Sequence, residues 1–127
     1  MARFFWICLG GAVGTGARYL LSGWALAVLG TALPWGTLAV NLVGSFLIGG
    51  LMHAALAARL IGPTARLALT SGVLGGFTTY STFNYETLEY FRAGNWYLGL
   101  ANIGLTVGLC LIAGLAGLIV SRWLVGA

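Results

Sequence analysis

The residues best suited to chemistry in this chain lie in the stretch GGFTTYSTFN, residues 75 to 84. Two adjacent glycines followed by several hydroxyl side chains form a poor helix interior, because glycine adds backbone entropy and hydroxyls compete for backbone groups. An interrupted helix frees carbonyl and amide groups, which inside a membrane are tolerated only when they are buried in protein or hold an ion. This stretch therefore indicates ion binding.

Other polar side chains lie within apolar sequence, and each has two interpretations. Asn41 can donate two hydrogen bonds and Ser45 follows one turn later, although lone asparagines in membranes often only bridge helices. Arg18 would attract anions if it faced a water-filled vestibule, or it would extend from its span to the interface. Thr106 belongs to a weakly polar stripe that continues to Cys110, a pattern more often found at helix contacts than along ion paths.

These residues lie in a chain that is 60% hydrophobic and only 6% charged, with a mean hydropathy of +0.98. Such a composition is far outside that of soluble domains and predicts an all-α membrane protein. A bilayer-spanning helix needs about 20 apolar residues, so the chain has room for about four spans. Breaks rich in proline, glycine and charge place these spans at about 4–29, 36–58, 66–91 and 96–121, within a single domain of residues 1–127.

The net charge of +4 comes from arginines, five of which fall at or near the ends of the predicted spans. This placement fits contact with the anionic lipid of a bilayer, and no basic cluster is dense enough for nucleic acid. Four arginines fall on the face that holds both termini and one on the other face, a modest lean toward cytoplasmic termini. The four are Arg3, Arg59, Arg66 and Arg122, and the one is Arg92.

Small residues recur at helical spacing and predict close helix packing, since lipid provides no hydrophobic drive for helix association. Tight packing leaves little interior for an aqueous pore, so an ion pathway would have to be narrow or lie at a subunit boundary. The pairs are Gly10 and Gly14, Ser45 and Gly49, Gly104 and Gly108, and Ala113 and Gly117.

Three motifs, taken in order along the chain, resemble those of one known family. They are GGAVGTGARY (10 to 19), PWGTLAVNLVGSFLIG (34 to 49) and GVLGGFTTYSTFNYE (72 to 86). Together they are similar to the Fluc/CrcB family of bacterial fluoride channels, and the match covers essentially the whole chain. The resemblance implies a fluoride-selective ion channel that gives passive export of cytoplasmic fluoride, as a multi-pass protein of the bacterial inner (plasma) membrane.

The resemblance also implies an antiparallel, dual-topology homodimer with two pores and a third helix broken near its centre. Antiparallel assembly calls for little charge bias, and four arginines against one are not neutral, so the homodimer rests on the resemblance alone. In the family the break binds a structural sodium ion through backbone carbonyls, which by motif position are those of Gly75 and Thr78 from both subunits. Oxygen ligands suit such a hard cation.

The residues expected along the fluoride pathway come from the same resemblance and from the polar groups described above. The family usually reads FSTF where this chain has YSTF, so the first aromatic is a departure from the pattern. The candidates are Asn41, Tyr80, Ser81, Thr82, Phe83, Thr106 and Arg18.

The main alternative is a small proton-coupled multidrug exporter, which can also have four short spans. That mechanism needs a carboxylate that titrates in the membrane, and Glu86 and Glu89 lie toward the end of the third segment, a poor match. An accessory membrane subunit would explain the glycines but not a broken span with donors. An enzyme is the least favoured class, because the sequence offers no nucleophile with a nearby base and no cluster of ligating residues.

Overall fold

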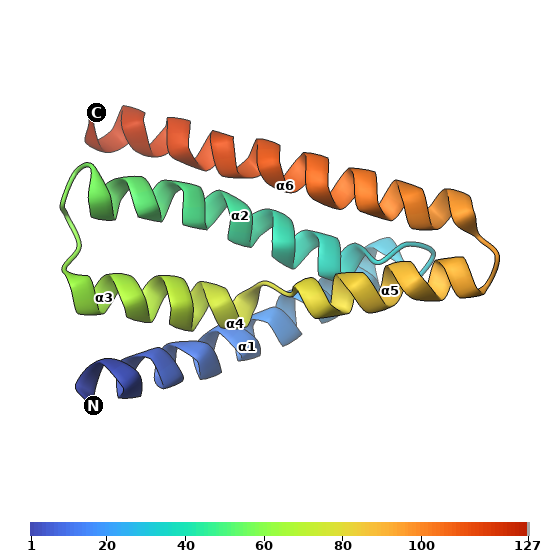
Figure 1. Ribbon diagram of the computed structural model, residues 1–127, viewed down its shortest axis with the longest axis horizontal. Coiled ribbons are helices and arrows are strands. Elements are labelled where there is room, and N and C mark those ends of the chain that lie inside the picture. Colours follow the sequence, from blue (N-terminus) through green and yellow to red (C-terminus); the bar gives the residue numbers. More distant parts are fainter. Residues whose placement is uncertain (127) are drawn as a thin grey trace.

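The computed structural model describes residues 1–126, and the regular structure over this range is helical. The helical segments run alternately in opposite directions, and both termini lie at one end of the bundle (Figure 1). Three segments are single helices: α1 (Ala2–Leu29), α2 (Trp35–Leu56) and α6 (Trp96–Val125). The remaining segment, third in chain order, is a composite of α3 (Pro63–Leu67), the π-helical η1 (Ala68–Leu74), α4 (Gly75–Phe77) and α5 (Tyr80–Arg92).

Each of α1, α2 and α6 is long and apolar enough to cross a membrane. The third segment is interrupted between α4 and α5, and both of its halves continue in the same direction across the bundle (Figure 1). The predicted all-α architecture of four segments with a broken third helix is therefore confirmed. Large apolar side chains such as Leu111, Ile112 and Leu115 of α6 are exposed, as expected for a surface solvated by lipid.

Close helix contacts form two seams, one between α2 and α6 and one between α1 and the first half of the third segment. A Cβ atom on Gly14 would collide with the carbonyl oxygen of Val73, and one on Gly117 with that of Phe46. These seams confirm the packing role predicted for three of the small-residue pairs. A Cβ on Gly104 or Gly108 would meet nothing within 4 Å among residues 1–126, so this pair makes no close contact within one copy and its packing role stays a prediction. Their face of α6 points away from the other helices.

Buried polar contacts fix the position of α6 in the bundle. The Asn102 Nδ2 donates to the Thr87 Oγ1 at 2.9 Å, and the Thr106 Oγ1 donates to the Asn102 Oδ1 at 3.5 Å. The weakly polar stripe of α6 is thus partly a helix contact. Near the other end, His53 of α2 lies 3.0 Å from the Ser121 hydroxyl through its Nδ1. Local spacing could not indicate this partner, because the two residues are 68 positions apart along the chain.

Candidate functional site: the break in the third helical segment

The break consists of two residues with extended backbone. Thr78 has φ −81° and ψ 158°, and Thr79 has φ −149° and ψ 111°. The predicted interruption is confirmed, but it is narrower than the stretch 75–84 suggested. Gly75 and Gly76 complete α4, and the residues from Tyr80 onward belong to α5. Thr79 caps α5, since its hydroxyl accepts the backbone N–H of Thr82 at 3.3 Å.

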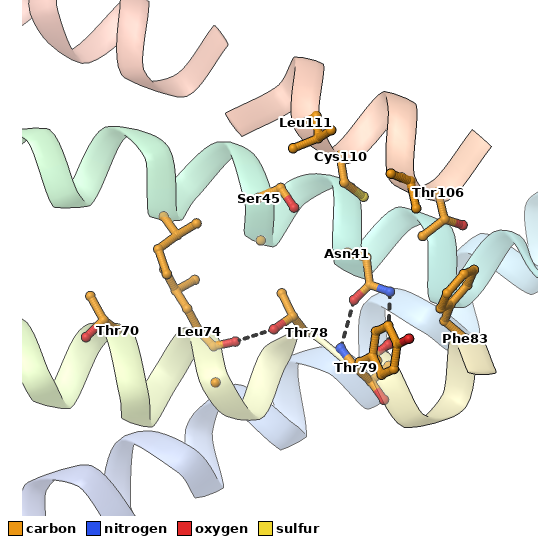
Figure 2. A pocket seen from close by; sticks show the side chains of 15 residues that line it. Asn41, Ser45, Thr70, Leu74, Thr78, Thr79, Phe83, Thr106, Cys110 and Leu111 are labelled. Carbon is orange, nitrogen blue, oxygen red and sulfur yellow. Dashed lines mark hydrogen bonds between the residues drawn. The ribbon is translucent and has the colours of Figure 1, made fainter. Parts of the chain in front are cut away.

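Asn41 of α2 holds the break by two hydrogen bonds to one residue. Its Oδ1 accepts the backbone N–H of Thr79 at 2.7 Å, and its Nδ2 donates to the carbonyl of Thr79 at 3.0 Å (Figure 2). A side chain on a neighbouring helix thus satisfies backbone groups that the interruption releases. The α2 helix reaches this position because Gly44 has no side chain, and a Cβ there would collide with the Thr78 methyl group.

These hydrogen bonds leave two carbonyls without their usual helical donors. In a continuous α-helix the N–H of Thr79 would bond to the carbonyl of Gly75, but here it bonds to Asn41. The N–H of Thr82 would bond to the carbonyl of Thr78, but here it bonds to the Thr79 hydroxyl. Neutral carbonyl oxygens at the C-terminal end of a helix are suitable ligands for a hard cation. The residues therefore fit the sodium ion that the family pattern implies.

An open hollow of about 460 Å³ lies beside the break, between α2, α6 and the third segment. Figure 2 shows Asn41 and Thr79 joined on one side of it, with Thr106 and Cys110 contributed by α6. Most of the predicted site residues line this hollow, namely Asn41, Gly75, Thr78, Tyr80, Phe83 and Thr106.

The two aromatic residues of the hollow differ in environment. Phe83 is buried, with 7% of its surface exposed, whereas Tyr80 is 78% exposed. Their ring centroids lie 5.7 Å apart, and the ring planes are tilted by 58°. The hydrogen bonds that Asn41 and Thr106 make go to Thr79 and Asn102, and neither goes to the Tyr80 hydroxyl.

A second hollow of about 540 Å³ is lined by two of the three remaining predicted residues, Arg18 and Thr82. Arg18 is half-buried at its wall, and Thr82 lines it from α5. Thr79 lines both hollows, so the break lies between them. Ser81 lines neither, although its hydroxyl is 3.4 Å from that of Thr79.

The sequence interpretation missed Thr37 and underrated Glu86. Thr37 lines the second hollow and donates from its Oγ1 to the Glu86 Oε1 at 2.6 Å. The other carboxylate oxygen of Glu86 is buried and lacks a hydrogen-bond partner among residues 1–126. The signal available in the sequence was a carboxylate inside a span, which is costly unless something uses it.

The fold and the site define a multi-pass helical membrane protein whose third span is broken beside hydrogen-bond donors and two carbonyls whose usual helical donors bond elsewhere. The family model described as "CrcB-like protein, Camphor Resistance (CrcB)" matches residues 5–118. A protein of Sorangium cellulosum named "Fluoride-specific ion channel FluC" is 52% identical to this chain, covering 98% of each. Proteins of the same name from Anaeromyxobacter sp. (strain K) and Geobacter sulfurreducens are 51% and 48% identical, covering 99% and 98% of this chain and 100% of each relative.

This chain belongs to the CrcB family. The resemblance drawn from the three sequence motifs is confirmed, and so is the interpretation of the chain as a multi-pass membrane protein of bacterial type rather than an enzyme.

Proposed function

We propose that this protein is a fluoride-selective ion channel of the bacterial inner membrane that lets cytoplasmic fluoride leave passively. The main support for the proposal is sequence identity of 48–52%, over nearly the full length, to relatives named as fluoride-specific ion channels. The gathering of donor side chains around a broken span adds physical support, because broken helices are where channels and transporters bind ions.

The break offers binding groups for ions of both signs. The C-terminal end of α4 presents carbonyl oxygens and the negative end of a helix dipole, which favour a cation. The N-terminal end of α5 presents backbone N–H groups and the positive end of its dipole, which favour an anion. A structural sodium ion at the carbonyls of Gly75 and Thr78 would therefore sit next to a fluoride pathway without competing for the same groups.

The proposed pathway uses donors that replace the water around fluoride. Asn41, Ser81, Thr82 and Thr106 supply amide and hydroxyl hydrogens, and the ring edges of Tyr80 and Phe83 carry the positive end of the aromatic quadrupole. Arg18 would attract anions to the second hollow. These residues occupy the two hollows that meet at Thr79, apart from Ser81, which contacts Thr79 directly.

We further propose that the protein functions as an antiparallel, dual-topology homodimer. Two carbonyls do not complete the coordination of a hard cation, and a second copy related by a twofold axis would supply two more. The 460 Å³ hollow is open at the side of the bundle, where a second copy could close it. Gly75 is exposed and lines this hollow, where an ion shared between subunits would bind.

Fluoride efflux from liposomes tests the function. Purified protein in fluoride-loaded liposomes should release fluoride once a potassium ionophore relaxes the membrane voltage, with the pH equal on both sides. Protein-free liposomes and chloride-loaded liposomes are the controls. Efflux that required a proton gradient would contradict the channel.

Absence of fluoride release at equal pH would favour the proton-coupled multidrug exporter, and one observation supports that alternative. Glu86 is a carboxylate in the third span with one oxygen buried and unpartnered over residues 1–126, the type of group that proton coupling requires. The measurement at equal pH separates the two functions without any variant.

A further inference from the structure

We propose that Asn41 and Thr79 are positioning residues for the cation site, because their side chains divert the two backbone donors that would otherwise occupy the carbonyls of Gly75 and Thr78. The inference rests on the proposed function, since it takes the cation to be bound at these carbonyls. It assigns Asn41 a role toward the cation in addition to its proposed contact with fluoride.

The first diversion is a competition for one N–H group. The N–H of Thr79 has two possible acceptors, the carbonyl of Gly75 four residues earlier and the Oδ1 of Asn41 on another helix. The structure pairs it with Asn41 at 2.7 Å, and the second bond, from the Asn41 Nδ2 to the Thr79 carbonyl at 3.0 Å, fixes the orientation of the carboxamide. Without Asn41 the helical bond would become the available partner, because a buried N–H left unpaired is costly.

The second diversion occurs within the break itself. The hydroxyl of Thr79 accepts the N–H of Thr82 at 3.3 Å and donates to the Thr82 Oγ1 at 3.0 Å. An N-cap of this kind satisfies one of the orphan donors at the start of α5. It also keeps that N–H away from the carbonyl of Thr78. The two side chains thus protect one proposed ligand carbonyl each.

The Asn41 clamp is held in place by its surroundings. Val40, the preceding residue, is 0% exposed, and Gly44 brings α2 into contact with Thr78. The carboxamide uses one of its two N–H hydrogens and one lone pair on Thr79, so one hydrogen remains for another partner. Asn41 also lines the 460 Å³ hollow. One side chain can therefore position the cation ligands and still donate to an anion.

The sodium dependence of thermal unfolding tests this inference on the full-length protein in detergent. The protein is purified in N-methyl-D-glucamine chloride and then titrated with NaCl at constant ionic strength. A ligand that binds only the folded state raises the unfolding temperature, and the concentration at which it does so reports its affinity. Loss of a merely structural contact lowers the unfolding temperature at every sodium concentration but leaves that concentration unchanged.

We expect Asn41→Leu to raise the sodium concentration at which stabilisation begins by at least about tenfold. The reason is that one ligand carbonyl returns to its helical donor. Thr79→Ala should produce a shift of the same kind, and Thr79→Ser, which keeps the hydroxyl, should restore the parent value. Ser45→Ala is the matched control, since Ser45 lines the same hollow one turn along α2. If Asn41→Leu does not fold, the Thr79 pair decides the question alone.

Three results would overturn the inference in distinguishable ways. If sodium does not stabilise the parent protein, the proposed cation site is wrong and this inference falls with it. If sodium stabilises the parent and all variants at the same concentration, only the positioning role is wrong. If Ser45→Ala shifts the sodium dependence as far as Asn41→Leu, the effect belongs to the polarity of the hollow and not to the diverted donors.

Discussion

The two halves of the third helical segment are attached to the bundle by different means. The first half packs on α1 by backbone contact, and Cβ atoms added to Gly72 and Gly76 would press against the carbonyl oxygens of Ile7 and Gly11 at 2.8 and 2.5 Å. The second half, Thr79 and α5, is attached by side-chain hydrogen bonds from other helices, in addition to the packing of Phe91 of α5 against Gly99 of α6. These bonds come from Asn41 to Thr79, from Thr37 to Glu86 and from Asn102 to Thr87.

The first half of the segment is therefore positioned by close backbone packing, whereas the second half carries the polar side chains that could bind an ion. Contacts between backbones pack α4 closely against α1, and the proposed ligand carbonyls lie at the end of this packed half. Polar contacts along α5 place donors and a carboxylate beside the two hollows, where hydrogen bonding to an ion is possible.

Phe83→Ile should remove most fluoride transport. Isoleucine keeps much of the apolar volume but lacks the ring edge, so the loss of about 1.4 kcal/mol of ion stabilisation would lower the rate about tenfold. The measurement is fluoride efflux from liposomes at matched protein density, with the dimer checked by size-exclusion chromatography. Phe77→Ile is the control, because Phe77 is also buried, at 8% exposed, but does not line the 460 Å³ hollow. Equal efflux from Phe83→Ile and the parent would leave Phe83 with an ordinary packing role.

Gly76→Ala should destabilise the first half, whereas Gly75→Ala should not. The Cβ on Gly76 would lie 2.5 Å from the carbonyl oxygen of Gly11, but the Cβ on Gly75 would lie 3.6 Å from that of Thr70, an ordinary contact. We expect about 1–3 kcal/mol of lost stability for Gly76→Ala. Thermal unfolding in detergent measures both variants. Equal unfolding temperatures for these neighbouring glycines would mean that α1 does not hold α4 as the structure indicates.

Thr87→Val should loosen the second half. The Thr87 hydroxyl accepts from Asn102 at 2.9 Å and is buried, so its removal leaves the amide of Asn102 without that partner, at a cost of about 1 kcal/mol or somewhat more. Thr70→Val is the matched control, because its hydroxyl donates only within its own segment, to the carbonyl of Arg66 at 2.8 Å. Thermal unfolding of the two variants compares an interhelical bond with a local one. A larger loss for Thr70→Val would contradict the assignment of α5 to polar attachment.

The sequence predicted the four segments and the location of the break, because hydropathy and the Gly-Gly-hydroxyl pattern act locally. It overestimated the width of the break, since Gly75 and Gly76 stay helical where α1 packs against them. The bond between Asn41 and Thr79 was out of reach, because it joins residues 38 positions apart and depends on how α2 packs. Spacing also could not tell which glycine pairs face a neighbour within one copy, and Gly104 and Gly108 do not.

Tyr80→Phe should have the smallest effect of these changes. The ring, its contact with Phe83 and the extended residues before it are all retained, and only a hydroxyl on a side chain that is 78% exposed in one copy is lost. A net hydrogen bond contributes about 1 kcal/mol, so fluoride efflux should stay within about fivefold of the parent in either direction. Tyr85→Phe is the control, because Tyr85 is 63% exposed on the same helix and does not line the 460 Å³ hollow.

The direction of the Tyr80→Phe change sharpens the comparison of the two halves. When a second copy covers the hollow, the hydroxyl must find a partner or cost about 1–3 kcal/mol. Faster efflux from the phenylalanine variant would mean that the hydroxyl binds the ion too tightly, and slower efflux would mean that it adds a donor to the pathway. A loss as deep as that of Phe83→Ile would contradict the prediction. It would make the hydroxyl a required ligand of the anion and place the chemistry of the α5 half at its first residue.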